Sequence, residues 1–273
     1  MKKLPKLYWI ISAVITIAGM SVMTVGAIQS KQENQKSQPI EIPSLCKGEE
    51  LENIIINIGS ADVIIEASPD DTVSLKLSND RQFEYQLENQ TLEIRNKKNS
   101  LFWDIQFIDI GIIQNENQII LSLPEKEYKE LKLSSGAGDM NFSDVDAETL
   151  NASAGAGNID LNKTEIKSDF AIDLGSGNFT AEDCQFSGIR IQNGAGETNM
   201  HNVTLAGNAE IKCGAGNITM MLSGNVQDYQ IDCSEVVGEV TIQNHNLKNT
   251  GSESAQYQIK ANTVGNAEFT FTE

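Results

Sequence analysis

The sequence predicts an all-β protein, a parallel β-solenoid with about 20 residues per coil that is preceded by one N-terminal transmembrane helix. Three observations lead to this prediction. A single uncharged apolar run lies near the start of the chain, a glycine-X-glycine motif returns at intervals of 19 or 20 residues, and apolar residues alternate with polar ones around each motif. The clear copies of the motif are residues 136–138, 155–157, 175–177, 194–196 and 214–216.

The first element is the apolar run, residues 7–28, which holds no charged side chain and follows Lys2, Lys3 and Lys6. A run of this length can span a bilayer, and its basic flank favours a cytoplasmic location for residues 1–6. The expected location is therefore the cell membrane, with a single pass and the rest of the chain outside. A cleaved signal peptide is the alternative, because Val25-Gly-Ala27 suits a signal peptidase, although the run is longer than a usual signal-peptide core.

The second element is a tether. Residues 29–44 are polar, lack aromatic side chains and contain two prolines, which is typical of a flexible linker. We therefore expect the folded extracytoplasmic domain to comprise residues 45–273.

The repeats themselves make up the third element. When the copies are aligned on their second glycine, the positions seven and five residues before it and two and four residues after it are apolar in all but one case, Thr198. This alternation on both sides of a glycine predicts a strand, a tight corner and a second strand in each unit. The twenty positions are Leu131, Leu133, Met140, Phe142, Leu150, Ala152, Ile159, Leu161, Phe170, Ile172, Phe179, Ala181, Ile189, Ile191, Thr198, Met200, Ala209, Ile211, Ile218 and Met220.

One such unit cannot bury its apolar face alone, so the units are expected to stack as coils around a continuous core. Glycine suits a corner that needs positive φ and close contact between coils. The pattern extends to units around Gly59 and Gly238, and Gly265 is expected to mark the terminal coil. Between residues 73 and 123 the repeat is irregular, and a hairpin is expected around residues 88–90.

The segment IILSLPEKEYKELKLSSGAGDMNF, residues 119–142, and the repeats after it resemble the putative-adhesin family of bacterial domains of unknown function. The resemblance runs from about Leu51 to Phe271. It implies a right-handed parallel β-solenoid on the bacterial cell envelope, often behind one membrane segment. It carries no catalytic residues to transfer.

The charge of the chain limits its partners. With 20 Lys and Arg against 38 Asp and Glu, the net charge is −18, which argues against binding to nucleic acid or to an anionic membrane surface. The expected partner is an envelope polymer or protein, and contact with the membrane is expected only through the N-terminal helix.

No cofactor or metal site is expected. The polar residues that follow each second glycine could bind calcium weakly, but hydrogen bonds along the sheet are the favoured interpretation. His201 and His245 are too few and too far apart for a metal site. Cys213 and Cys233 are expected on adjacent coils, too far apart for a disulfide, so all four cysteines are expected to be buried thiols.

The sequence favours a non-enzymatic adhesion or envelope interaction module. No catalytic residue is expected, because Arg190 has no carboxylate pair in its own unit. Two alternatives stay open, an envelope-stress sensor or accessory protein of a membrane partner, and a carbohydrate-active β-helix enzyme. The candidate contact residues are Phe102, Trp103, Asn158, Asn178 and Asn217.

Overall fold

The computed structural model describes residues 39–78, 82–97, 117–243, 245–246, 249–251 and 255–272. The predicted membrane segment, residues 7–28, and the candidate contacts Phe102 and Trp103 lie outside these residues. Within the described ranges, no helix has the length and apolarity that a membrane crossing requires.

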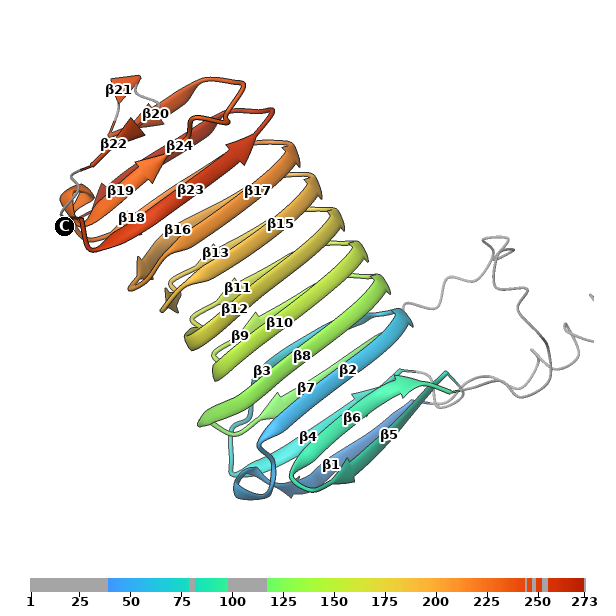
Figure 1. The fold of residues 1–273 in the computed structure, drawn as a ribbon. Helices are drawn as coiled ribbons and strands as arrows, with labels where there is room; N and C mark the ends of the chain where they lie inside the picture. Colours follow the sequence, from blue (N-terminus) through green and yellow to red (C-terminus); the bar gives the residue numbers. More distant parts are fainter. Residues whose placement is uncertain are drawn as a thin grey trace, which may run out of the picture. The chain divides into compact units, whose positions relative to one another are not determined.

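The described residues form an all-β, solenoid-like stack in which most neighbouring strands are parallel (Figure 1). In each coil of the central part, one strand leads through the glycine corner into a second strand, and the first strand is the longer one except in the coil of β15 and β16. The register follows the repeat, since Leu131 pairs with Leu150 and Leu150 pairs with Phe170. The central strands are β8 (Glu127–Ala137), β9 (Met140–Ser143), β10 (Asp146–Ala156), β11 (Ile159–Asn162), β12 (Glu165–Ser176), β13 (Phe179–Glu182), β14 (Gln185–Phe186), β15 (Ile189–Ala195), β16 (Thr198–Leu205), β17 (Ala209–Ala215) and β18 (Ile218–Ser223).

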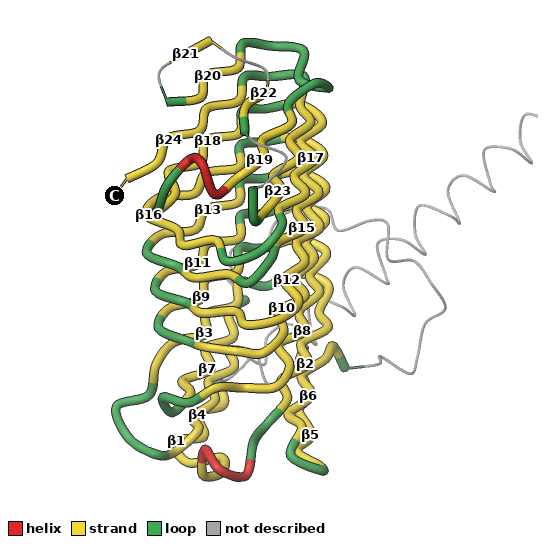
Figure 2. The backbone as a smooth tube through the Cα atoms, turned by 60° about the vertical axis from the view of Figure 1, so that its left-hand side comes forward, coloured by secondary structure: helices red, strands yellow, loops and turns green. Residues whose placement is uncertain are grey.

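The core lies between the strands of each coil and continues from coil to coil (Figure 2). All twenty predicted inward positions are buried, which confirms the alternation inferred from the repeat. Thr198 is fully buried, and its hydroxyl has no hydrogen-bond partner. Apolar burial in these columns is the main force that joins the coils.

The glycine corners have the predicted geometry. Gly157 has a φ of 129°, and a Cβ atom placed on it would lie 2.2 Å from the carbonyl oxygen of Gly138 in the preceding coil. Both the backbone conformation and the close approach therefore require glycine.

The N-terminal end departs from simple sequence order (Figure 1). Its strands are β1 (Ile40–Lys47), β2 (Asn53–Ser60), β3 (Asp62–Ala67), β4 (Thr72–Leu77), β5 (Phe83–Glu88), β6 (Thr91–Asn96) and β7 (Gln118–Leu123), with a short 3-10 helix at Gly48–Glu50. Strand β2 lies between β6 and β8, and β3 lies between β7 and β9. The coil of β2 and β3 therefore lies between the central coils and a later segment of the chain that contains β6 and β7.

The hairpin expected around residues 88–90 is confirmed. Strands β5 and β6 pair antiparallel, and Asn89 and Gln90 at the turn have φ values of 49° and 60°. Two successive residues with positive φ match the twist of a hairpin.

The boundary expected at residue 45 is wrong, because β1 begins at Ile40 and pairs antiparallel with β4. The physical reason is the alternation of Ile40, Glu41 and Ile42, which lets both isoleucines pack against the core while the glutamate faces outward. The last residues of the predicted tether therefore belong to the folded unit.

The C-terminal end shows a second exchange of order. Its strands are β19 (Tyr229–Asp232), β20 (Val240–Ile242), β21 (His245–Asn246), β22 (Asn249–Thr250), β23 (Tyr257–Thr263) and β24 (Ala267–Thr272). Strand β23 lies between β17 and β19, and β24 lies between β18 and β20. The coil around Gly265 was expected to end the stack. It lies instead between the coil of β17 and β18 and the outer coil of β19 and β20.

This insertion also corrects the expected neighbours of two cysteines. Strand β23 separates Cys213 from the coil of Cys233, so these residues do not lie on adjacent coils. The outer coil can end the stack because β22 pairs antiparallel with β19 and β21 pairs antiparallel with β20, which covers strand edges. All four cysteines lie in the described part of the chain and are buried thiols, as predicted.

Candidate interaction surface

A ladder of side-chain hydrogen bonds runs along the glycine corners. The Oδ1 atom of Asp139 accepts a 2.7 Å bond from the backbone amide of Asn158. In the same way, Asn158 accepts from the amide of Asn178 at 3.0 Å, and Asn178 accepts from the amide of Glu197 at 2.9 Å. Each short polar side chain therefore satisfies a backbone donor of the next coil.

The ladder is interrupted at Glu197. Its longer side chain accepts a 3.4 Å bond from the amide nitrogen of the Asn199 side chain instead of bonding to the next coil. The ladder resumes where Asn217 accepts from the amide of Asn266, and Asn266 accepts from the amide of Glu239. Aspartate and asparagine have the reach that this position needs.

Three of the predicted contact residues belong to this ladder. Asn178 and Asn217 are exposed, whereas Asn158 is half-buried. The side-chain oxygen of each bonds to the backbone of the following coil. Their contact with a partner remains a prediction, as does that of Phe102 and Trp103.

A second line of corners is absent from the sequence-based prediction. Asp144, Lys163, Asp183 and Asn202 have φ values between 49° and 56° and mark successive coils. Aspartate and asparagine tolerate this left-handed conformation better than most residues. Their recurrence at intervals of 19 or 20 residues is the signal that could have revealed the corner.

The outer face of the longer strands carries a row of alternating charge. Arg190 of β15 pairs in register with Glu210 of β17, Glu210 pairs with Lys260 of β23, and Lys260 pairs with Asp232 of β19. Within its own repeat unit, Arg190 has no pair of carboxylates, as the sequence indicates. The partners come from other units because parallel pairing aligns the same position of successive coils.

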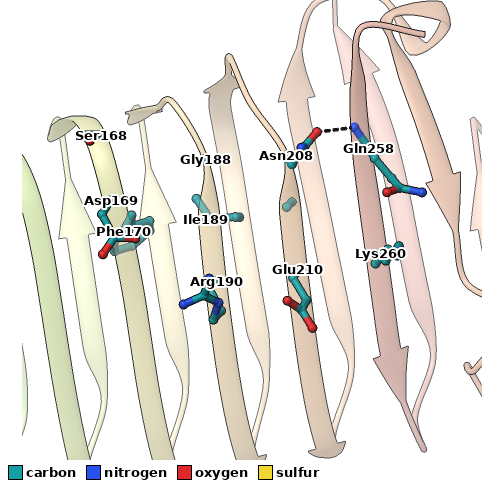
Figure 3. Close-up of a pocket in the computed structure, with 11 residues that line it drawn as sticks. Ser168, Asp169, Phe170, Gly188, Ile189, Arg190, Asn208, Glu210, Gln258 and Lys260 are labelled. Atoms are coloured by element: carbon teal, nitrogen blue, oxygen red, sulfur yellow. Dashed lines mark hydrogen bonds between the residues drawn. The ribbon is translucent and has the colours of Figure 1, made fainter. Parts of the chain in front are cut away.

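A hollow of about 360 Å³ lies beside this row, over β12, β15, β17 and β23 (Figure 3). Gly188 contributes no side chain, which leaves space between Asp169 and Asn208. In the view of Figure 3, Asn208 and Gln258 line the upper part, and the Oδ1 atom of Asn208 accepts a 2.9 Å bond from the backbone amide of Gln258. Arg190, Glu210 and Lys260 line the lower part; Glu210 and Lys260 also line a neighbouring hollow of about 290 Å³.

The acidic and basic side chains of this hollow differ in whether they form ion pairs. Lys212 lies 2.6 Å from a Glu210 carboxylate oxygen and lowers the pKa of that carboxyl by hydrogen bonding and by charge, with smaller contributions from Arg190 and Lys260. Arg190 and Lys260 form no ion pair within the described part of the chain. Arg95, in contrast, lies 2.7 Å from Glu84.

This arrangement is suited to holding an anionic group rather than to transferring a proton. The pKa of Glu210 is lowered, so its carboxylate is ionised at neutral pH. Burial, opposed by a hydrogen bond from Thr180, raises the pKa of Asp160, an acid that lies apart from the hollow on β11. Among the described residues, no three His, Cys, Asp or Glu side chains form a group that could hold a metal ion.

The chain can now be compared with known proteins. The model of the Toastrack DUF4097 family matches residues 51–269. Among curated proteins, none matches the chain.

The solved structures that match the chain come from several bacteria. A putative cell adhesion protein from Clostridium sporogenes is 19% identical, with 86% of this chain and 100% of that chain covered and a TM-score of 0.42. A putative adhesin from Bacteroides fragilis is 13% identical, with 86% and 97% covered and a TM-score of 0.44. A putative lipid binding protein from Parabacteroides distasonis is 16% identical, with 87% and 95% covered and a TM-score of 0.41.

Proposed function

As the chain belongs to the Toastrack DUF4097 family, we propose that it is a non-enzymatic interaction module on the outer side of a bacterial cell membrane. Residues 7–28 form a transmembrane helix, residues 1–6 stay in the cytoplasm, and a β-solenoid with about 20 residues per coil binds an envelope polymer or protein.

The observation that carries this proposal is the outer face of the stack. Parallel pairing places polar side chains of successive coils side by side, as with Asp160 beside Thr180 and Thr180 beside Asn199. A repeated polar face offers many similar contacts to a polymer, and their combined affinity can exceed that of any one contact. This favours an interaction role over chemistry at one centre.

The electrostatics of the hollow also support binding. A glycosidase needs one carboxyl that keeps a proton and a second carboxylate close to it. Glu210 has a lowered pKa and is paired with Lys212. Incubation of the full chain with envelope and plant polysaccharides, with and without calcium, should therefore release no reducing or unsaturated ends. Release of such ends that stops when Glu210 is replaced by Gln would establish the enzyme alternative.

Topology can be tested separately. Protease added to intact, wall-stripped cells should digest the domain and leave a fragment that contains residues 7–28. Digestion only after the membrane has been opened would contradict the proposed orientation. Cross-linking in the same cells distinguishes partners: recovery of one membrane protein in fixed proportion would favour the sensor or accessory alternative, whereas retention on isolated envelope polymer supports the proposal.

A further inference from the structure

We propose that the hollow over Gly188 binds an oligosaccharide that carries one carboxylate per sugar, a uronic-acid chain, and that Arg190 and Lys260 hold a carboxylate of this ligand. The inference rests on the proposed function, since it names the ligand class and the site for an interaction module. The relevant residues are drawn in Figure 3.

Arg190 supplies a cationic group to the hollow. Its guanidinium has five donors, yet it forms no ion pair or side-chain hydrogen bond with any other described residue. Glu210 stands in register on the neighbouring strand, but its carboxylate is bonded to Lys212. A planar guanidinium binds a carboxylate through two parallel hydrogen bonds, which makes an anionic ligand its natural partner.

Lys260 supplies a second cationic group to the hollow. It occupies the same row as Arg190 two strands away, so the two Cα atoms are about 9–10 Å apart. Figure 3 shows Glu210, on the strand between them, pointing away from Asn208 and Gln258. Two long cationic side chains can therefore converge on one anionic group at the open side of the hollow.

The hollow has room for a small ligand. Gly188 leaves a gap in a row that carries Asp169 on one side and Asn208 on the other. A volume of about 360 Å³ is within the range of small-ligand sites and accommodates one or two sugar rings. Asp169, Asn208 and Gln258 line this gap and offer acceptors and donors to hydroxyl groups.

The mixed charge of the site selects among anionic ligands. Asp169, Glu210 and the chain's net charge of −18 disfavour a densely charged polyanion or a strongly acidic peptide. A uronic-acid chain spaces its carboxylates by a sugar ring and surrounds each with hydroxyl groups, which can donate to Asp169. The site therefore favours an acidic saccharide.

Calorimetric titration of the full chain, purified in mild detergent, provides the test. The probes are tetragalacturonate, its methyl ester, and a glutamate tetrapeptide. The acid should bind, the ester should bind at least about tenfold more weakly because it lacks the charge, and the peptide should bind more weakly than the acid. Equal binding of acid and ester, or tighter binding of the peptide, would overturn the inference.

Variants locate the binding. Arg190→Gln should weaken binding of the acid at least about tenfold, and Arg190→Lys should recover part of the loss. Lys132→Gln is the matched control, because Lys132 is an exposed outward residue of β8, outside the hollow, and its loss changes the net charge equally. An equal effect of Lys132→Gln would mean that general charge, not this site, attracts the ligand.

Filling the hollow gives a test that leaves the charge unchanged. A Cβ atom on Gly188, the residue before β15, would lie 3.4 Å from the nearest backbone oxygen, that of Asn208, so the backbone accepts a side chain there. Gly188→Gln should keep the thermal unfolding temperature and abolish binding. Unchanged binding by this variant would contradict the site. If tetragalacturonate does not bind but the chain still associates with isolated envelope polymer, only this inference fails; loss of both would contradict the proposed function as well.

Discussion

The backbone amide of Asn266 donates a 3.0 Å hydrogen bond to the Oδ1 atom of Asn217, which lies 49 residues earlier in the chain. The bond ties the inserted coil of β23 and β24 to the coil of β17 and β18. Asn217→Ala should lower the free energy of unfolding by about 0.5–1.5 kcal/mol and speed hydrogen exchange at the Asn266 amide.

The matched control for this bond is Glu197→Ala. Glu197 occupies the equivalent corner position one coil earlier, but its carboxylate does not bond to the next coil. Its replacement should change stability by less than about 0.5 kcal/mol. Equal losses for the two variants would mean that the ladder bond does not secure the inserted coil.

The buried columns predict that inward residues contribute much more to the free energy of unfolding than outward residues do. Ile172 is buried and lies between Ala152 and Ile191 of the neighbouring coils. Ile172→Ala should cost about 2–5 kcal/mol in chemical unfolding, because it removes apolar contacts and leaves a cavity. Asn178→Ala, at an exposed corner, should cost about 1 kcal/mol or less. Similar losses would contradict the assignment of the columns.

Two glycines separate the effect of backbone conformation from that of close packing. Gly224 has a φ of 115° with nothing within 4 Å of an added Cβ, so Gly224→Ala should cost about 1–3 kcal/mol from conformation alone. Gly157→Ala adds a clash with the carbonyl oxygen of Gly138 and should cost more or prevent folding. If Gly157→Ala proved no worse than Gly224→Ala in urea unfolding, the corners would not be closely packed.

The buried thiol of Cys184 predicts a dependence on alkaline pH. Burial is the main cause that raises its pKa from 9.0 to about 11, so the folded state holds this proton more tightly than the unfolded chain does. The resulting stabilisation is complete below pH 9 and is lost as the pH rises towards 11. In Cys184→Ala, the free energy of unfolding should fall less steeply over this window than in the unchanged protein. Parallel pH profiles would contradict the shifted pKa.

Much of the fold could be predicted because each repeat packs on the next repeat in the sequence. The order of the coils in the stack therefore follows the order of the chain. Where a unit packs on the unit 19 or 20 residues away, the column that contains Ile172 can be read directly from the sequence. The 19- or 20-residue interval does not predict which strands are neighbours at the two ends of the stack. The coil of Tyr257–Thr263 packs against β17, and the intervening segment that ends the stack has no local signal for its position.

The hollow was harder to predict for the same reason. Glu210 could have been placed beside Arg190 from the 20-residue interval alone. Lys260, in contrast, reaches the row only through the inserted coil, 50 residues after Glu210. The gap at Gly188 depends on the absence of a side chain, and a glycine directly before a strand has several structural explanations.

The clamped ends determine where the length of the protein can change. Addition or removal of one whole 19- or 20-residue coil between β8 and β12 would preserve every pairing at both ends, because each interior coil presents equivalent edges to its neighbours. A similar change next to β2 or β23 would separate strands that meet only through the exchanged order. Duplication and deletion of coils can therefore alter the length of the stack in steps of about 4.8 Å, while both ends and the hollow keep their construction.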